Sequence, residues 1–238
     1  MVLVNKPSGV EATHFRIAEI VHDLHSRIDA DSDTVIAELA EHAAIEVPGA
    51  QYAGVTITRN ARNIDTPAAT HRWPILLDEI QQRYREGPCL TAAWEERTVH
   101  VADLETDDRF PLYRRDALAQ TPIRSIMAFQ LFIADETMGA LNVYAENANT
   151  FGPESRDIGL VFAAHSSVAW NSARRDEQFK RALASRDIIG QAKGMIMERY
   201  GVDAVRAFEL LRKLSQDSNV RLNQIAEELV AKAQTSES

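Results

Sequence analysis

Basic side chains near the carboxyl end are the residues of this chain best suited to bind a charged partner. From residue 174 onward, the sequence has 12 Lys and Arg against 10 Asp and Glu, which gives a net charge of +2. Residues 1–173 have 14 Lys and Arg against 25 Asp and Glu, which gives a net charge of −11. A mildly basic segment on an acidic body allows an anionic partner, but not strong nonspecific binding of nucleic acid. A few placed cations must then make the contacts, and the candidates are Arg186, Lys193, Arg212, Lys213 and Arg221.

The same five cations allow a second interpretation, as solvated charges of an ordinary helical surface. Arg186 and Lys193 are seven residues apart, so they lie on one helical face beside an apolar stripe. Three acidic neighbours would neutralise the cations by ion pairing, namely Asp187, Glu209 and Asp217. The residue types leave both interpretations open.

Cys89 is the chain's single cysteine and follows Gly87-Pro88 at the start of a predicted helix. A helix N-terminus lowers the pKa of a thiol, which would suit a redox sensor. The other interpretation, which we favour, is a small buried residue in the first turn of a core helix. A dithiol reductase needs a resolving cysteine, and this chain has none. A single cysteine also fits a reducing, cytoplasmic location.

Neither a metal site nor a catalytic site is predicted. His22 and His25 share a helical face but lack carboxylate or cysteine ligands nearby, although a single axial histidine to haem would leave no pattern. Asp103, Asp107 and Asp108 are expected to cap a helix and turn a loop. The sequence has no phosphate-binding glycine loop and no Ser/His/Asp order. No apolar run is long enough to span a membrane, so no membrane partner is expected.

Three amphipathic helices are predicted to position the basic residues. Their apolar stripes comprise Ile189, Ala192, Ile196 and Met197, then Ala207, Leu210, Leu211 and Leu214, then Leu222, Ile225, Ala226 and Leu229. Gly201 suits a left-handed position after the first helix, Asp203 can cap the second, and Asn219 can end it. Because the connections are short, we expect the three helices to share one small core.

The preceding residues predict an α+β domain, in which helices flank an antiparallel sheet. Helices are expected at residues 17–28, 33–45 (capped by Asp33) and 73–84, with a short one after Gly87-Pro88 and a helix or irregular loop at 107–118. Alternating apolar residues predict strands at 53–57, 99–101, 125–133 and 139–144. The last two strands are separated by a short turn and should form a hairpin.

A long helix is predicted to join the two regions, from residue 154 to residue 200. At 1.5 Å per residue it would be about 70 Å long. Its apolar stripe contains Ile158, Val161, Val168, Phe179, Ala182, Ile189 and Ile196. A two-stranded coiled coil would cover this stripe, and together with the amino-terminal helices it would hold the chain as a homodimer. The alternative, equally open, is a marginal helix packed on its own domain.

Four short elements run through the last three helices: Ala192-Lys193-Gly194, Ala207-Phe208, Leu211-Arg212-Lys213 and Ser218-Asn219. Their order and spacing resemble the ANTAR domain, a three-helix RNA-binding module of bacterial transcription antiterminators. Ser215 departs from the pattern, because alanine is more usual there. The runs Arg85-Glu86-Gly87-Pro88-Cys89, Val99-His100-Val101-Ala102-Asp103-Leu104, Arg124-Ser125 and Met138-Gly139-Ala140-Leu141-Asn142-Val143-Tyr144 resemble a GAF domain, of the type often joined to an ANTAR domain in actinobacterial regulators.

These resemblances imply a GAF domain, a long linker helix and a three-helix ANTAR bundle. The expected divisions are an amino-terminal segment and helix (1–29), the GAF sensor domain (30–172), a helical linker (173–184), the ANTAR domain (185–232) and a flexible tail (233–238). The implied function is signal-responsive transcription antitermination. The GAF domain would sense a signal and dimerise, and the ANTAR domain would bind stem-loops in nascent RNA through Arg186, Lys193, Arg212, Lys213 and Arg221. The resemblance leaves room for a small-molecule effector, whose identity is unknown.

Two other functions compete with this one. The second and third helices could form a helix-turn-helix that binds DNA, although the third helix is acidic at Glu227-Glu228 and has no exposed base-reading residues. The chain could also be a ligand-binding or redox GAF protein with an accessory tail.

Overall fold

The computed structural model describes residues 32–59, 63–132 and 137–236. The chain divides into two compact units, Met1–Arg174 and Arg175–Ser238. The helix predicted at residues 17–28 lies outside the described residues.

A five-stranded antiparallel sheet forms the centre of the first unit, with strand order β2-β1-β5-β4-β3. The strands are β1 (Tyr52–Arg59), β2 (Asn63–Ala69), β3 (Thr98–Val101), β4 (Ser125–Phe132) and β5 (Thr137–Ala145). The predicted hairpin is confirmed, because β4 pairs with β5 and places Ala128 opposite Asn142. The predicted strands at 53–57 and 99–101 are confirmed as β1 and β3.

Strand β2 is the element that the sequence pattern did not predict. It lies at the edge of the sheet and pairs with β1. Its sequence, NIDTPAA, has no clear apolar alternation. Pro67 falls where the pairing shifts register between Val55 and Ile57, and an edge strand tolerates its missing N–H. Tertiary pairing therefore imposes a strand that local preference does not specify.

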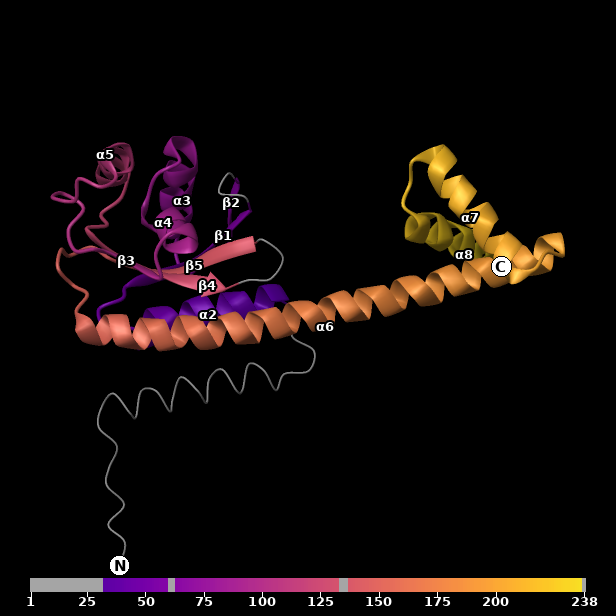
Figure 1. Cartoon of the computed structure of the whole chain (residues 1–238), viewed down its shortest axis with the longest axis horizontal. Coiled ribbons are helices and arrows are strands. Elements are labelled where there is room, and N and C mark those ends of the chain that lie inside the picture. The colour runs from indigo at the N-terminus through magenta and orange to yellow at the C-terminus, as the bar shows by residue number, and fades with distance from the viewer. Residues whose placement is uncertain (1–31, 60–62, 133–136, 237–238) are drawn as a thin grey trace, which may run out of the picture. The chain divides into compact units, whose positions relative to one another are not determined.

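Helices cover both faces of this sheet (Figure 1). They are α2 (Ser32–Glu46), α3 (Arg72–Tyr84), α4 (Pro88–Trp94), α5 (Pro111–Gln120) and the first part of α6 (Pro153–Tyr200). Helices α2 and α6 pack with Phe129 in one core, and α3, α4 and α5 pack with Ala128 in the other. Neighbouring residues of β4 point to opposite faces, so the same strand serves two buried cores.

Two helix starts differ from the sequence prediction. Helix α2 begins at Ser32, so Asp33 lies inside its first turn and is not its cap. Helix α5 begins after Phe110, which gives no side-chain cap. Glu86 instead accepts hydrogen bonds from the backbone N–H groups of Leu112 and Tyr113, the latter at 2.8 Å. Because Glu86 is 27 residues away from Tyr113, no local sequence signal marks it as the cap.

Helix α6 approaches the sheet closely at Gly159. A Cβ atom there would lie 2.0 Å from Cζ of Phe129, a fully buried ring. The absence of a side chain therefore sets the distance between this helix and β4. Gly190, further along the same helix, has no atom within 4 Å of the corresponding position.

The second unit is a bundle of three helices with one small core. Its buried side chains are Ala192, Ile196, Ala207, Leu211, Ala226 and Val230. They come from the end of α6, from α7 (Ala204–Ser218) and from α8 (Leu222–Ser236). The predicted bundle is thus confirmed, although Leu214 of the expected stripe is 49% exposed.

The predicted helix ends in this bundle are confirmed. Gly201 has a left-handed φ of +60° after α6. Asp203 caps α7 by accepting a hydrogen bond from the N–H of Arg206 at 2.8 Å. Asn219 ends α7 in the left-handed conformation. Ser215, the departure from the family pattern, donates its hydroxyl to the carbonyl of Val220 at 2.6 Å and so fits the turn.

The apolar stripe of α6 is divided among three environments. Ile158 is buried in the core of the first unit, and Ile196 in that of the second. Between them, Val168 and Phe179 are exposed. The first part of the helix therefore packs on its own domain, while the middle part leaves large apolar side chains uncovered.

Candidate nucleic-acid interface

The five cations predicted from the sequence lie on the surface of the bundle. Arg186, Arg212, Lys213 and Arg221 are exposed, and Lys193 is half-buried. Among the described residues, none of the five has an ion-pair partner within 4 Å. Glu209, expected as a neutralising partner, is instead bound by Arg206 at 2.9 Å. In the part of the chain that the structure describes, none of the three acidic neighbours therefore pairs with these cations, and the interpretation as a solvated surface stays open.

Arg186 and Lys193 share a line along α6 with Tyr200. Residues seven apart on a helix are only about 20° from alignment, because 3.6 residues make one turn. Residues 186, 193 and 200 follow this spacing. Tyr200 ends the helix and is 66% exposed. Two cations and an exposed aromatic ring therefore lie along one side of the helix.

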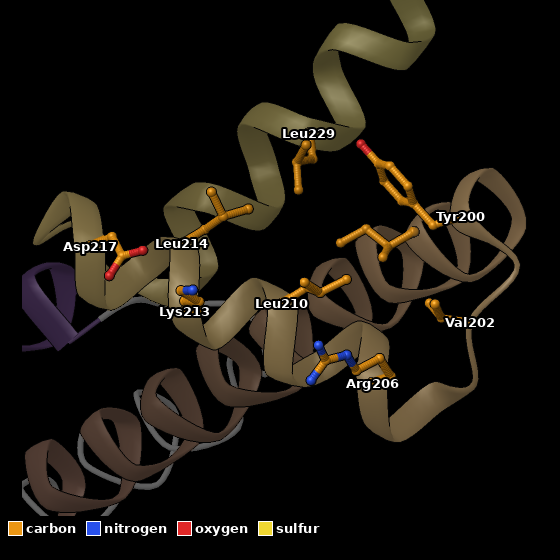
Figure 2. Close-up of a pocket in the computed structure, with 9 residues that line it drawn as sticks. Tyr200, Val202, Arg206, Leu210, Lys213, Leu214, Asp217 and Leu229 are labelled. Carbon is orange, nitrogen blue, oxygen red and sulfur yellow. The ribbon is translucent and has the colours of Figure 1, made fainter.

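A groove of about 580 Å³ lies beside that ring (Figure 2). Ile196 and Tyr200 of α6, Val202 of the following turn and Leu229 of α8 form part of its wall. Helix α7 supplies the rest, with Arg206, Leu210, Lys213, Leu214 and Asp217. These five positions fall at three- and four-residue steps, so one face of α7 is turned toward the groove.

Charged side chains stand around this apolar surface. Arg206, Lys213 and Asp217 are all exposed and line the groove. Figure 2 shows the Tyr200 ring directed toward Leu229. The arrangement can stack a flat apolar group, bind an anion beside it and accept hydrogen bonds at one end.

Arg212 and Arg221 do not line this groove. Successive helical residues project about 100° apart, so Arg212 points to a different face of α7 from Lys213. Arg221 lies in the turn before α8. The structure therefore brings one of the five predicted residues, Lys213, into the groove, and aligns Arg186 and Lys193 with the tyrosine beside it.

Sequence reasoning missed Tyr200 and Arg206. Both stand next to elements that it did use, at the end of α6 and in the first turn of α7. Tyr200 carried a signal in its seven-residue spacing from Lys193, but only the packing of α7 and α8 makes its ring one side of a groove.

Cys89 is buried in the first unit and is no exposed sensor thiol. Its Sγ lies 3.6 Å from the Tyr144 hydroxyl, and its backbone N–H donates to Gln81 at 2.9 Å. Burial is the main cause that raises the pKa of the thiol, and the nearby Asp78 carboxylate raises it further. The favoured interpretation of Cys89 as a small buried residue in the first turn of a core helix is confirmed. The alternative of a lowered pKa is wrong, because desolvation outweighs the helix N-terminus.

Asp78 is the centre of the buried polar cluster around Cys89. The hydroxyls of Thr56 and Thr66 donate to its carboxylate at 2.7 and 2.8 Å, and the Gln81 side chain donates at 2.9 Å. Burial raises the pKa of Asp78 from 3.8 to about 6, although these donors oppose the rise. Among the described side chains, no cation pairs with this carboxylate.

The other carboxylates singled out in the sequence form ion pairs on the surface. Asp103 binds Arg124 at 2.9 Å, Asp107 binds Arg109, and Asp108 binds Arg114. Asp103 and Asp107 also accept backbone N–H groups two residues ahead, so they turn loops as predicted. The prediction that this group caps a helix is wrong, since Glu86 does so.

The part of the chain that the structure describes lacks two further features. Within it, no group of three or more His, Cys, Asp or Glu side chains is arranged to hold a metal ion. Nor does any described helix have the length and apolarity to cross a membrane.

Solved GAF domains share the fold of the first unit. The GAF domain from an Acinetobacter phosphoenolpyruvate-protein phosphotransferase is 13% identical and covers 71% of this chain and 97% of its own, with a TM-score of 0.53. The phycocyanobilin-bound GAF domain from a cyanobacterial phytochrome is 15% identical over 72% and 98%, with a TM-score of 0.51. Likeness at this level of identity concerns the fold alone.

Family models match the chain over two adjacent stretches. The GAF domain model matches residues 29–171, more than half of the chain, and the ANTAR domain model matches residues 177–230. No curated protein matches the chain. A GAF domain is a sensor module and an ANTAR domain is an RNA-binding module of antitermination regulators, so both are regulatory. The chain belongs to the GAF domain family, and its domain order is that of a two-domain GAF–ANTAR regulator.

Proposed function

We propose that this chain is a signal-responsive transcription antiterminator whose ANTAR domain binds stem-loops in nascent RNA. The observation that carries the proposal is a set of cations on that domain that have no ion-pair partner among the described residues: Arg186, Lys193, Arg212, Lys213 and Arg221. Phosphate contacts of this kind fix a protein on nucleic acid, while unpaired loop bases supply sequence information. Binding would favour an antiterminating RNA structure over a terminator.

We assign residues 30–172 to the sensor, 173–184 to a helical linker and 185–232 to RNA binding. The charge difference between the two regions supports this division, since RNA would be repelled by the acidic GAF domain and attracted by the ANTAR domain. Glu227 and Glu228 are exposed on α8. Such charges would oppose entry of this helix into the major groove of DNA, which favours RNA over the helix-turn-helix alternative.

We also propose that the chain acts as a homodimer through α6. Phe179 is 66% exposed and Leu183 is 44% exposed, one turn further along the same helix. Large apolar side chains at three- and four-residue spacing are the positions that a paired helix covers. In light scattering, a Phe179→Ser, Leu183→Ser double variant should be monomeric at concentrations where the native chain is a dimer. A native chain that is monomeric throughout would overturn the proposal.

The RNA proposal is tested with full-length protein and two labelled pools of equal length. One pool contains RNA stem-loops with randomised loops, and the other contains duplex DNA. We expect the protein to retain the RNA pool at salt concentrations that release the DNA. A preference for duplex DNA would overturn the antiterminator function.

The cations are tested on a stem-loop selected from that pool. Lys193→Ala combined with Arg212→Ala should weaken binding and lower the slope of log K against log salt by about one for each lost phosphate contact. Arg97→Ala is the matched control, because Arg97 is an exposed arginine of the GAF domain. Unchanged affinity and slope in the double variant would leave these residues as a solvated surface.

A further inference from the structure

The groove of the ANTAR domain has the chemistry of a nucleobase site. Ile196, Leu210 and Leu229 give it an apolar surface, and Tyr200 presents an exposed ring beside them. Its volume of about 580 Å³ lies within the range of about 300–1,000 Å³ that is usual for small-ligand pockets. Bases released from an RNA loop stack on aromatic side chains in such sites.

We propose that this groove receives one unpaired base of the RNA loop, stacked on Tyr200, with Arg206 and Lys213 holding the adjoining phosphates. The inference rests on the proposed function, because it names the part of the RNA that the same domain reads. It adds Tyr200 and Arg206 to the residues proposed to bind RNA, and it assigns Lys213 to a phosphate beside the stacked base.

The distribution of charge favours RNA as the occupant of this groove. Arg206 and Lys213 line it, and Lys193 lies two helical turns before Tyr200 along α6. A phosphate on either side of a stacked base would therefore meet a cation. Neither lysine has an ion-pair partner among the described residues, so no protein carboxylate has to be displaced from them, whereas Arg206 would exchange its exposed ion pair with Glu209 for a phosphate.

Asp217 gives the groove a means of reading the base edge. Its carboxylate is exposed at the groove and carries only acceptors when ionised. Amino groups on a base edge are donors, whereas phosphate oxygens would be repelled. The carboxylate therefore favours a base at this end of the groove, whereas the cations favour phosphates of the RNA backbone elsewhere in it.

The test uses the full-length protein and a labelled stem-loop selected from the randomised RNA pool. Each loop residue is replaced in turn by an abasic residue, which removes the base and keeps the phosphate. The native protein should lose affinity about five- to a hundredfold at one loop position, the range expected when one stacked base is lost. Tyr200→Ala should bind the intact loop more weakly by a similar factor and become insensitive to base removal at that position.

Two further variants separate stacking from other roles of the tyrosine. Tyr200→Phe should keep both the affinity and the abasic sensitivity, because it keeps the ring. Phe208→Ala is the matched control, since Phe208 is an exposed aromatic residue of α7 that does not line the groove. Circular dichroism establishes that each variant remains helical.

The possible failures are distinguishable. If the native protein binds no stem-loop, the proposed function itself fails. If it binds but Tyr200→Ala keeps the full abasic sensitivity, the base site alone is overturned. A change of oligomeric state in Tyr200→Ala, with RNA binding unaltered, would assign the groove to a second copy of the chain and also overturn it.

Discussion

The GAF domain buries its polar cluster, whereas the ANTAR domain exposes its polar side chains to solvent. In the GAF domain, Asp78 and Cys89 are buried, and both form a hydrogen bond with the side chain of Gln81. In the ANTAR domain, Lys213 and Tyr200 are exposed around a groove, and the buried core contains only apolar side chains. A macromolecule can reach the second set directly, whereas the first set is shielded from direct contact.

The domains also differ in how much core supports them. The GAF sheet is buried on both faces by two clusters of side chains. The ANTAR bundle depends on six buried side chains, three of which are alanine. Small domains bury a lower fraction of their surface and are marginally stable. Core substitutions should therefore lower the stability of the ANTAR bundle more readily than that of the GAF domain.

The largest effect is expected from Leu211→Ala, because Leu211 is fully buried in the smaller core. Such a truncation costs about 2–5 kcal/mol of unfolding free energy, which is enough to unfold a small bundle. All three tryptophans, Trp73, Trp94 and Trp170, lie in the first unit. Tryptophan fluorescence should therefore keep its native denaturation midpoint while far-ultraviolet circular dichroism shows early loss of helix.

Leu214→Ala is the control for that experiment. Leu214 lies on the same helix and is 49% exposed, so its truncation should change stability by no more than about 0.5 kcal/mol. Equal destabilisation by the two variants would mean that Leu211 is not part of a distinct core.

The buried carboxyl of Asp78 should give the GAF domain an unusual pH dependence. Its pKa is about 6 in the folded chain and 3.8 when unperturbed, so the folded state holds the proton more tightly. The unfolding free energy should then fall as pH rises from about 4 to about 6, by up to about 3 kcal/mol, and level off above. Chemical denaturation at a series of pH values, followed by tryptophan fluorescence, measures this slope.

Asp78→Asn should remove that slope, and Asp116→Asn provides a control of opposite sign. A hydrogen bond from Tyr84 lowers the pKa of Asp116, so this residue stabilises the fold at higher pH and loses its contribution as pH falls. If Asp78→Asn leaves the pH profile of the native chain intact, the carboxyl is not desolvated in solution.

Glycines of α6 should respond oppositely in the two domains. Gly159→Ala places a methyl group 2.0 Å from Phe129, and overpacking of this kind costs about 1–3 kcal/mol. Gly190→Ala meets no atom within 4 Å and should add up to about 1 kcal/mol of stability, because alanine is the better helix former. Denaturation midpoints of the two variants measure the difference. A loss of stability in both would show that Gly190 is also packed closely.

The smallest expected effect is a difference in RNA binding between variants of two neighbouring residues on α7. Lys213→Ala removes a groove cation, and Arg212→Ala removes one from a different face. Both should lower the salt slope of RNA binding by about one. Only Lys213→Ala should change the affinity ratio between the intact loop and its abasic form. Identical behaviour of the two variants would remove the distinction between the groove and the rest of the domain surface.

Much of this architecture could be predicted from the sequence because its signals are local. Asp203 and Asn219 set the ends of α7 through bonds to residues at most a few positions away, and the β4–β5 hairpin follows from alternating residues around a short turn. The ANTAR and GAF elements were similarly readable from their order and spacing. Side-chain period and capping chemistry do not require knowledge of the rest of the chain.

Tertiary structure alone decided the features that depend on residues far apart. Strand β2 forms because β1 offers it an edge, and Glu86 caps α5 from 27 residues away. The pKa of Asp78 depends on burial, which removes its carboxylate from water. The groove needs three helices to bring Tyr200 beside Lys213. The sequence determined which cations the ANTAR domain carries. Only packing decided which of them face a common surface, because that depends on how each helix is rotated against its neighbours.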